Sequence, residues 1–137
     1  MATNIPILRI RDVLIATVGD DMHDELAMEL QEELSARLSG GGARGVLIDV
    51  SAATVIDTFV GRMLISIGRA AKLVGAEAVV VGIRPAVAMT LVDLGISLEG
   101  LRTALDVDHA LSLIAGLDET KVSGATQPDH SRRSRHR

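Results

Sequence analysis

The sequence has no cysteine, tryptophan or tyrosine, and Phe59 is its one aromatic side chain. Without cysteine, disulfides, thiolate catalysis and cysteine-ligated metals are excluded, and the absence is typical of a cytoplasmic protein. The lack of aromatics disfavours nucleic-acid modules that stack bases on aromatic rings. The core must therefore be built from aliphatic side chains and methionine, and with 47% hydrophobic residues the 137-residue chain has enough of them for one domain.

Long apolar segments and a positively charged leader are also missing. No apolar run approaches the roughly 20 residues of a membrane-spanning helix, so no membrane association is expected. The opening MATNIPILRIRD does not have the pattern of a signal peptide. The net charge is −4, and because residues 118–137 hold more bases than acids, the rest of the chain is more acidic still. An acidic body binds a phosphate backbone poorly, so nucleic acid is not expected as a partner.

What remains is an alternation of short apolar runs with segments of helical periodicity. Strands are expected at residues 5–10, 13–18, 45–50, 76–82 and 101–104, and helices at 22–38, 58–74, 85–94 and 107–115. The first two strands form an opening hairpin, and the run GVLIDV is typical of a central strand covered on both faces. The order ββαβαβαβα predicts a single α/β domain in which helices pack against a β-sheet.

Glycines give further expectations. Gly116 is expected to end the last helix, which places the domain at residues 1–117 and leaves 118–137 as a disordered polar and basic tail. Gly61 and Gly68 lie inside the second helix, where each glycine costs about 1 kcal/mol relative to alanine. Close approach of this helix to the sheet is the simplest reason for them, and a partner packed on that face is the alternative.

Three other patterns suggest chemistry, and each has a simpler interpretation. The glycine-rich turn at residues 40–45 leads into a strand and lacks the Gly-Lys-Ser/Thr of a phosphate-binding loop. The histidines have no metal-ligand spacing, so no metal site is expected; they are His23, His109, His130 and His136. Asp49, at the end of a central strand, and Asp57 suggest a carboxylate pair, but no histidine base accompanies them, so no catalytic residue is assigned. Asp49 and the glycine-rich turn at residues 40–45 leave a nucleotide-binding α/β domain as an alternative.

The step Asp57-Thr58 opens the second helix. Both residue types are preferred at helix starts, so one of them is expected to cap the helix. A residue there also lies on the edge of the sheet where α/β folds place their sites, and an exposed hydroxyl there could receive a phosphoryl group. The helix amides would favour the phosphate, while its charge of about −1.5 to −2 beside Asp57 would repel a bound partner. Thr58 is thus a candidate phosphorylation site. Its phosphorylation is expected to release a bound partner and to leave the domain folded.

Several stretches taken together resemble the STAS domain and, within that family, the RsbS-type antagonist of the stressosome. They are IPILRI, HDELA, GARGVLIDVS, VIDTFVGRML, PAVAMTLVDLGI and TALDVDHAL, which cover most of residues 5–115. The resemblance implies a mixed β-sheet and a non-enzymatic scaffold without a cofactor. It also implies that the chain sequesters an RsbT-like switch kinase, assembles with an RsbR-like STAS paralogue and with copies of itself into a large complex, and is reset by a phosphatase.

On this chain the resemblance assigns the phosphoacceptor to Thr58, where RsbS-type proteins usually have serine. Residues around this position become candidate partner contacts, namely Asp49, Asp57, Phe59, Gly61 and Arg62. A classical anti-anti-sigma factor, which binds an anti-sigma kinase directly, is the alternative within the family. Such proteins usually carry Asp-Ser-Ser-Gly at this junction, where this chain has Asp-Thr-Phe-Val.

Overall fold

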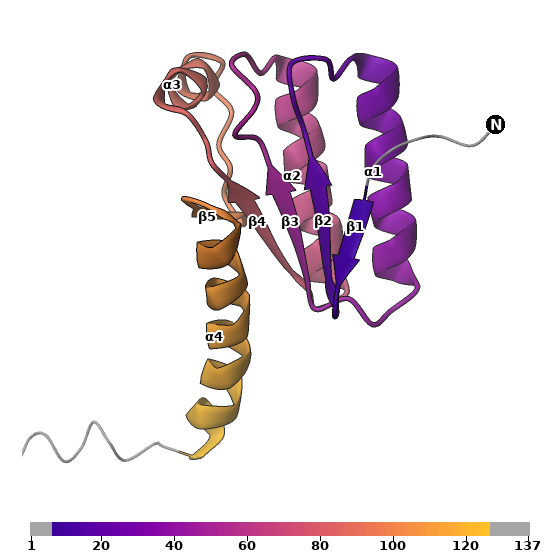
Figure 1. Cartoon of the computed structure of the whole chain (residues 1–137), viewed down its shortest axis with the longest axis vertical. Helices are drawn as coiled ribbons and strands as arrows, with labels where there is room; N and C mark the ends of the chain where they lie inside the picture. The colour runs from indigo at the N-terminus through magenta and orange to yellow at the C-terminus, as the bar shows by residue number, and fades with distance from the viewer. Residues whose placement is uncertain (1–6, 127–137) are drawn as a thin grey trace, which may run out of the picture.

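A computed structural model describes the backbone of residues 7–126 and the side chains of residues 7–116. Its centre is one five-stranded sheet with helices on both faces (Figure 1). The strands are β1 (Ile7–Ile10), β2 (Val13–Thr17), β3 (Gly45–Asp49), β4 (Glu77–Val81) and β5 (Arg102–Ala104). They lie side by side in chain order; β1 pairs with β2 antiparallel and every later pairing is parallel. The predicted hairpin, element order and mixed sheet are confirmed.

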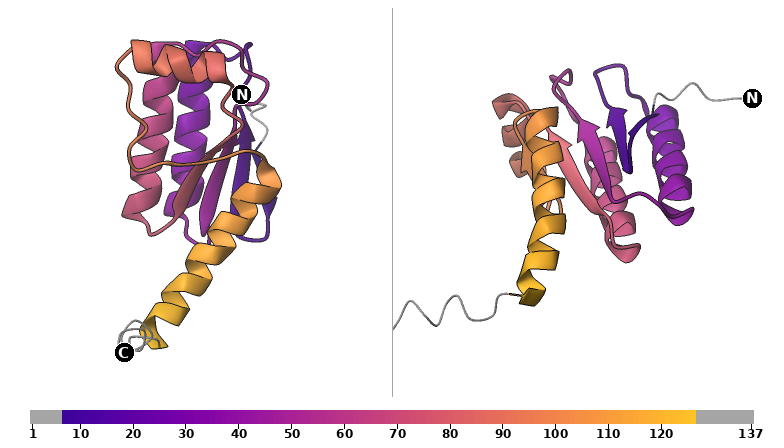
Figure 2. Two further views of the ribbon diagram at one scale, coloured as in Figure 1. Left: turned by 90° about the vertical axis from the view of Figure 1, so that its left-hand side faces the viewer. Right: turned by 60° about the horizontal axis from the view of Figure 1, so that its bottom comes forward.

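The helices occupy three places around the sheet. α1 (Asp24–Ser39) and α2 (Thr58–Leu73) pack side by side on one face, and α4 (Val107–Thr126) covers part of the other. The short α3 (Pro85–Asp93) lies at the end of the sheet to which the parallel strands point (Figure 2). Loops that leave β2 and β3 meet at this same end, so the fold brings together segments that are distant in sequence.

The central strand β3 explains why its sequence is apolar without interruption. Val46 and Ile48 belong to the core beneath α1 and α2, whereas Leu47 belongs to the core beneath α4, and all three are 0% exposed. Successive side chains of a strand point to opposite faces, so a strand covered on both faces has no solvent side. Burial of each such side chain stabilises the fold by roughly 1.5–3 kcal/mol.

The predicted end of the last helix is wrong. α4 continues past Gly116 to Thr126, and its last turns extend beyond the sheet (Figure 1). Gly116 is not among the glycines with positive φ, so it stays in the right-handed helix instead of adopting the left-handed conformation that ends one. The proposed domain boundary at residue 117 remains a prediction, and the part of the predicted tail at residues 127–137 lies outside the described residues.

The reason for the glycines inside α2 also differs from the expectation. A methyl group on Gly61 would come within 2.7 Å of the Ile96 side chain, and one on Gly68 within 2.6 Å of the Leu101 side chain. The close neighbours are therefore side chains of the segment that joins α3 to β5, and not the sheet. That segment crosses α2 closely, which sequence spacing alone does not reveal.

Candidate functional site

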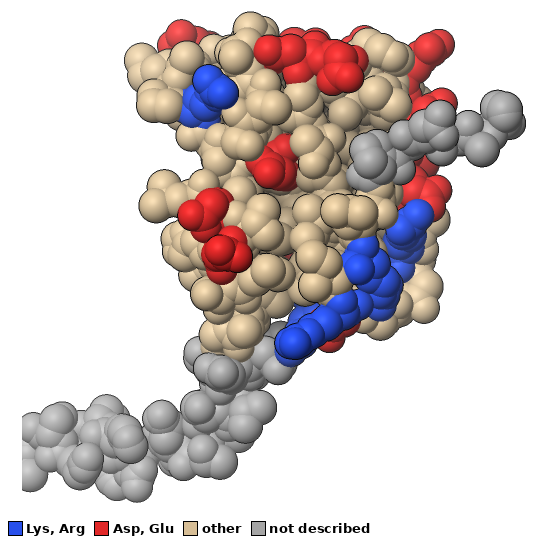
Figure 3. Space-filling model, viewed as in Figure 1, with Lys and Arg blue, Asp and Glu red and all other residues tan. Residues whose placement is uncertain are grey.

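The candidate site lies at the end of the sheet where the carboxyl ends of the parallel strands meet, as in other α/β folds. The β2–α1 loop and the β3–α2 loop enclose a hollow of about 390 Å³ there, and Asp20 and Asp57 both line it. Figure 3 shows acidic side chains gathered along the upper edge of the molecule and a band of basic ones at the lower right. The start of α2 thus belongs to the acidic end of the domain.

The cap of α2 is Asp57. Its backbone is extended, with φ −93° and ψ 178°, and its side chain accepts a hydrogen bond from the Val60 amide at 2.9 Å. Thr58 is the first helical residue, is exposed, and makes no side-chain hydrogen bond within the described part of the chain. Of the two residues expected to cap the helix, only Asp57 does so, which leaves the Thr58 hydroxyl unengaged.

The chemistry available at Thr58 follows from this arrangement. The first amides of a helix and its dipole favour an anion at its N-terminus. The neighbouring Asp57 carboxylate already supplies one negative charge there. A second anion, on the Thr58 oxygen, would be stabilised by the helix amides and repelled by the Asp57 carboxylate. By this argument an anion on the Thr58 oxygen would not require α2 to unwind.

The loop that leads to Thr58 is anchored at its start by Asp49. One oxygen of the Asp49 carboxylate accepts from the Ser51 amide at 2.9 Å and from the Ser51 hydroxyl at 2.7 Å. Arg84, the residue before α3, donates from Nε to the Ser51 carbonyl oxygen at 2.8 Å. Asp49 therefore shapes its own loop, while Arg84 ties that loop to the start of α3.

The middle of the same loop is anchored by Asp20 from the β2–α1 loop. Its carboxylate accepts from the Thr54 amide at 2.8 Å, the Thr54 hydroxyl at 2.6 Å and the Val55 amide at 3.2 Å. The hydrogen bonds from Thr54, foremost that of its hydroxyl, lower the pKa of the Asp20 carboxyl. Sequence reasoning does not single out Asp20, because its partners lie 34 and 35 residues away and no local pattern marks them.

The remaining predicted contact residues are divided between surface and interior. Phe59 is 37% exposed, and Arg62 is exposed on the next turn of α2, whereas Gly61 is buried. Asp49 and Asp57 line different hollows, that of Asp49 being shared with Asp106 and Asp108. The structure therefore does not bring together the carboxylate pair that the sequence suggested.

The two histidines in the described part of the chain accept hydrogen bonds from backbone amides. His23 caps α1 by accepting from the Leu26 amide, and His109 accepts from the Leu105 amide. Among the described residues, no group of three or more histidine, aspartate and glutamate side chains is arranged to hold a metal ion. In that same part of the chain, no helix is long and apolar enough to cross a membrane.

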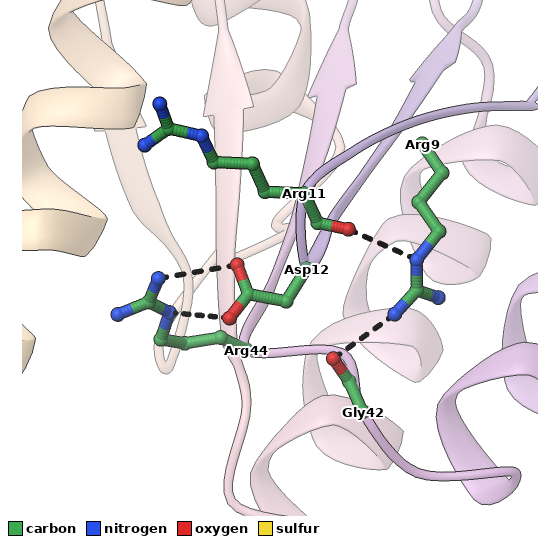
Figure 4. Close-up of polar contacts among 5 residues, drawn as sticks. All are labelled: Arg9, Arg11, Asp12, Gly42 and Arg44. Atoms are coloured by element: carbon green, nitrogen blue, oxygen red, sulfur yellow. Dashed lines mark hydrogen bonds and ion pairs between the residues drawn. The ribbon is translucent and has the colours of Figure 1, made fainter.

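Two arginines at the opposite end of the sheet, Arg9 and Arg44, make structural contacts through their side chains (Figure 4). Arg44 forms two contacts with the Asp12 carboxylate, at 3.0 and 3.1 Å, and Arg9 donates to the carbonyl oxygens of Arg11 and Gly42 at 3.0 and 3.1 Å. These contacts join the turn of the β1–β2 hairpin to the chain that enters β3. The candidate site and this cluster are thus at different ends of the domain.

Comparison with known proteins assigns the fold to a family. The family model described as the STAS domain matches residues 4–110. The chain belongs to the STAS-domain family. This STAS domain is similar to the solved structure of RsbS from Moorella thermoacetica, in a variant with one serine replaced by glutamate. The identity is 37%, the TM-score is 0.77, and the match covers 85% of this chain and 99% of that one.

Two further relatives place this STAS domain near stressosome proteins. A chain from a structure described as the molecular architecture of the stressosome, a signal integration and transduction hub, is 39% identical with a TM-score of 0.72, over 82% of this chain and 98% of that one. The RsbT co-antagonist protein RsbRA of Bacillus subtilis is 36% identical over 93 residues, which is 61% of this chain and 34% of the relative. This STAS domain therefore matches about a third of RsbRA, and within the family it is RsbS-like.

Proposed function

We propose that this STAS domain is a non-enzymatic scaffold of a cytoplasmic stressosome, which holds a serine/threonine switch kinase and releases it when Thr58 is phosphorylated. The observation that carries the proposal is Thr58, which is exposed at the first position of α2 and whose hydroxyl makes no hydrogen bond within the described residues. Similarity to RsbS and to a stressosome chain supports the same role.

Release follows from the surroundings of Thr58. Val55 is 69% exposed and Phe59 is 37% exposed, so apolar surface flanks the hydroxyl on both sides in sequence. A kinase docked there would cover this apolar surface and Asp57. A phosphate with a charge of about −1.5 to −2 would then lose its hydration against the apolar surface, and the Asp57 carboxylate would repel it. Both effects weaken the interface with the kinase. Since the helix amides favour the anion, the domain itself stays folded.

The candidate contact residues contribute in different ways. Asp57, Phe59 and Arg62 are exposed and form the docking surface in this proposal. Gly61 is buried close to Ile96, so it supports that surface from beneath. Asp49 holds Ser51 and thereby shapes the preceding loop.

Further partners are proposed from the relatives. RsbRA carries the name of an RsbT co-antagonist, and we infer an RsbT-like kinase, an RsbR-like STAS paralogue, other copies of this chain and a resetting phosphatase as partners of this STAS domain. The alternative is a classical anti-anti-sigma factor that binds an anti-sigma kinase directly. It draws on the shared fold with SpoIIAA, a structure described as an anti-sigma factor antagonist, at 10% identity and a TM-score of 0.64.

The test is phosphate transfer from ATP by the cognate RsbT-like kinase, with the modified residue mapped by mass spectrometry. We expect a single phosphate on Thr58, more rapid transfer to a Thr58→Ser variant, whose side chain lacks the restricting methyl group, and no transfer to Thr58→Ala. Phosphate on another residue with Thr58 unmodified would refute the proposal.

A binding measurement completes the test. Thr58→Ala should hold the kinase as the wild type does, and Thr58→Asp should weaken binding by on the order of tenfold or more, because one charge is placed in the docked surface. Thr103→Asp, which adds the same charge at an exposed threonine of β5, is the matched control and should bind normally. Equal binding by Thr58→Asp and wild type would contradict the release mechanism.

A further inference from the structure

Asp20 joins two loops that are separated by 34 residues of sequence. A single side chain satisfies two consecutive backbone amides, those of Thr54 and Val55, and accepts a third hydrogen bond from the Thr54 hydroxyl. Within the described residues these are the hydrogen bonds that hold the middle of the β3–α2 loop, here called the loop apex and comprising Thr54 and Val55. Without Asp20, both amides would have only water as a partner.

The loop apex is flanked by firmly packed residues. Ala53 is 0% exposed and its amide donates to the Val50 carbonyl at 3.0 Å, while Ile56 is 2% exposed. Between these two buried residues the apex is exposed, and Val55 extends most of its side chain into solvent. Packing therefore fixes the chain on either side of the apex but leaves the orientation of the apex itself to the Asp20 hydrogen bonds.

The loop apex and the start of α2 form one continuous surface. Thr54, Val55 and Asp57 line the same hollow as Asp20. Thr58 follows Asp57 directly and is held by α2, whose cap and first backbone bonds do not involve Asp20. A change at Asp20 would thus alter the surface beside the phosphoacceptor without displacing the acceptor.

We propose that Asp20 is a positioning residue for kinase recognition: by holding Thr54 and Val55 it fixes the exposed apolar side chain that a kinase contacts beside Thr58. The consequence for the kinase rests on the proposed function, whereas the holding of the loop apex does not. Loss of Asp20 affects recognition, and therefore KM, more than the transfer step, because the acceptor hydroxyl stays on α2.

The chain offers matched variants for a test. Asp20→Ala removes all three hydrogen bonds. Asp20→Asn keeps an oxygen that accepts from both amides and supplies an N–H group to the Thr54 hydroxyl, so it should restore the apex. Asp21→Ala removes the same charge from the same loop, at an exposed side chain for which no hydrogen bond is present in the described part of the chain.

The first measurement is amide hydrogen exchange on the full chain, resolved by NMR at Thr54 and Val55. In Asp20→Ala we expect exchange at these two amides to accelerate by on the order of tenfold or more, with the β3 amides unchanged, since only a local opening is made easier. Asp20→Asn and Asp21→Ala should exchange as the wild type does. Unchanged exchange in Asp20→Ala, or an equal rise in Asp21→Ala, would overturn the proposal.

The second measurement is steady-state phosphorylation of Thr58 by the cognate RsbT-like kinase. Asp20→Ala should raise KM several-fold with kcat little changed, and Asp20→Asn should return KM to near the wild-type value. A fall in kcat with KM unchanged would indicate that a smaller fraction of the variant is folded, and it would overturn the positioning role. If the wild type takes no phosphate on Thr58, the proposed function and the consequence for the kinase fail, while the exchange result still decides whether Asp20 holds the loop apex. If the wild type is phosphorylated and Asp20→Ala has the same KM, only the present inference fails.

Discussion

Replacing Asp57 with alanine removes the oxygen that accepts from the Val60 amide at 2.9 Å and leaves that amide without its partner at the start of α2. The loss of a capping side chain costs about 1 kcal/mol, and the loss of a negative charge at a helix N-terminus adds about 0.3–1 kcal/mol. Val60 is only 4% exposed, so water is poorly placed to replace the carboxylate. We therefore expect Asp57→Ala to lower the free energy of unfolding by about 1.5 kcal/mol.

The same reasoning predicts a much smaller effect next to Asp57. The Thr58 hydroxyl does not cap the helix, so Thr58→Ala should change the free energy of unfolding by less than about 0.5 kcal/mol. Asp57→Asn is the control, because asparagine caps about as well as aspartate and loses only the charge. Urea unfolding followed by far-UV circular dichroism suits a chain without tryptophan. If Thr58→Ala costs as much as Asp57→Ala, or Asp57→Ala costs nothing, the assignment of the cap is wrong.

Four other predictions test the fold. Leu47→Ala, at a 0% exposed position in β3, should cost about 2–5 kcal/mol in urea unfolding, because it leaves a cavity beneath α4. Hydrogen bonding from Arg44 lowers the pKa of Asp12; the folded-state pKa lies below the unfolded one, so this pair stabilises the fold above the unfolded value of about 3.9 and the gain is lost as the pH falls further. An NMR titration of the Asp12 carboxyl should give a higher midpoint in Arg44→Ala than in the wild type, because the hydrogen bond that lowers the pKa is removed. Arg11 has φ 57°, so Arg11→Gly should raise stability by about 1 kcal/mol in the same urea assay. A chain ending at residue 117 should fold and melt within a few degrees of the full chain, and failure to fold would place residues 118–137 within the domain.

Most of the secondary structure was predictable because its causes are local. Continuous apolar runs identify strands covered on both faces, and leucines at helical spacing identify the buried face of α1, where Leu30, Leu34 and Leu38 are buried as expected. The end of α4 was not predictable in this way. A glycine permits a helix to stop but does not compel it, and Gly116 keeps right-handed geometry.

The candidate site was predictable only in part. Asp57-Thr58 stands out in the sequence because helix starts need such residues, but which one caps depends on the backbone geometry of the junction, and the structure gives that role to Asp57. Asp49 and Asp57 looked like a pair by residue type, yet they line different hollows. Side-chain direction on a strand and at a helix start is set by the surrounding fold, and residue type does not report it.

By itself the sequence determined the order of the elements, the aliphatic core and the place of Thr58 at the start of a helix. These follow from the identity and spacing of near neighbours along the chain. Only the tertiary structure decided that Asp20 holds Thr54 and Val55, and that the side chains of Ile96 and Leu101 lie close to the glycines of α2. It also decided that Thr58 is exposed and that its hydroxyl makes no hydrogen bond to any residue whose side chain is described. Each of these depends on residues brought together by packing of the sheet and helices, and such contacts between distant segments leave no periodic pattern in a single sequence.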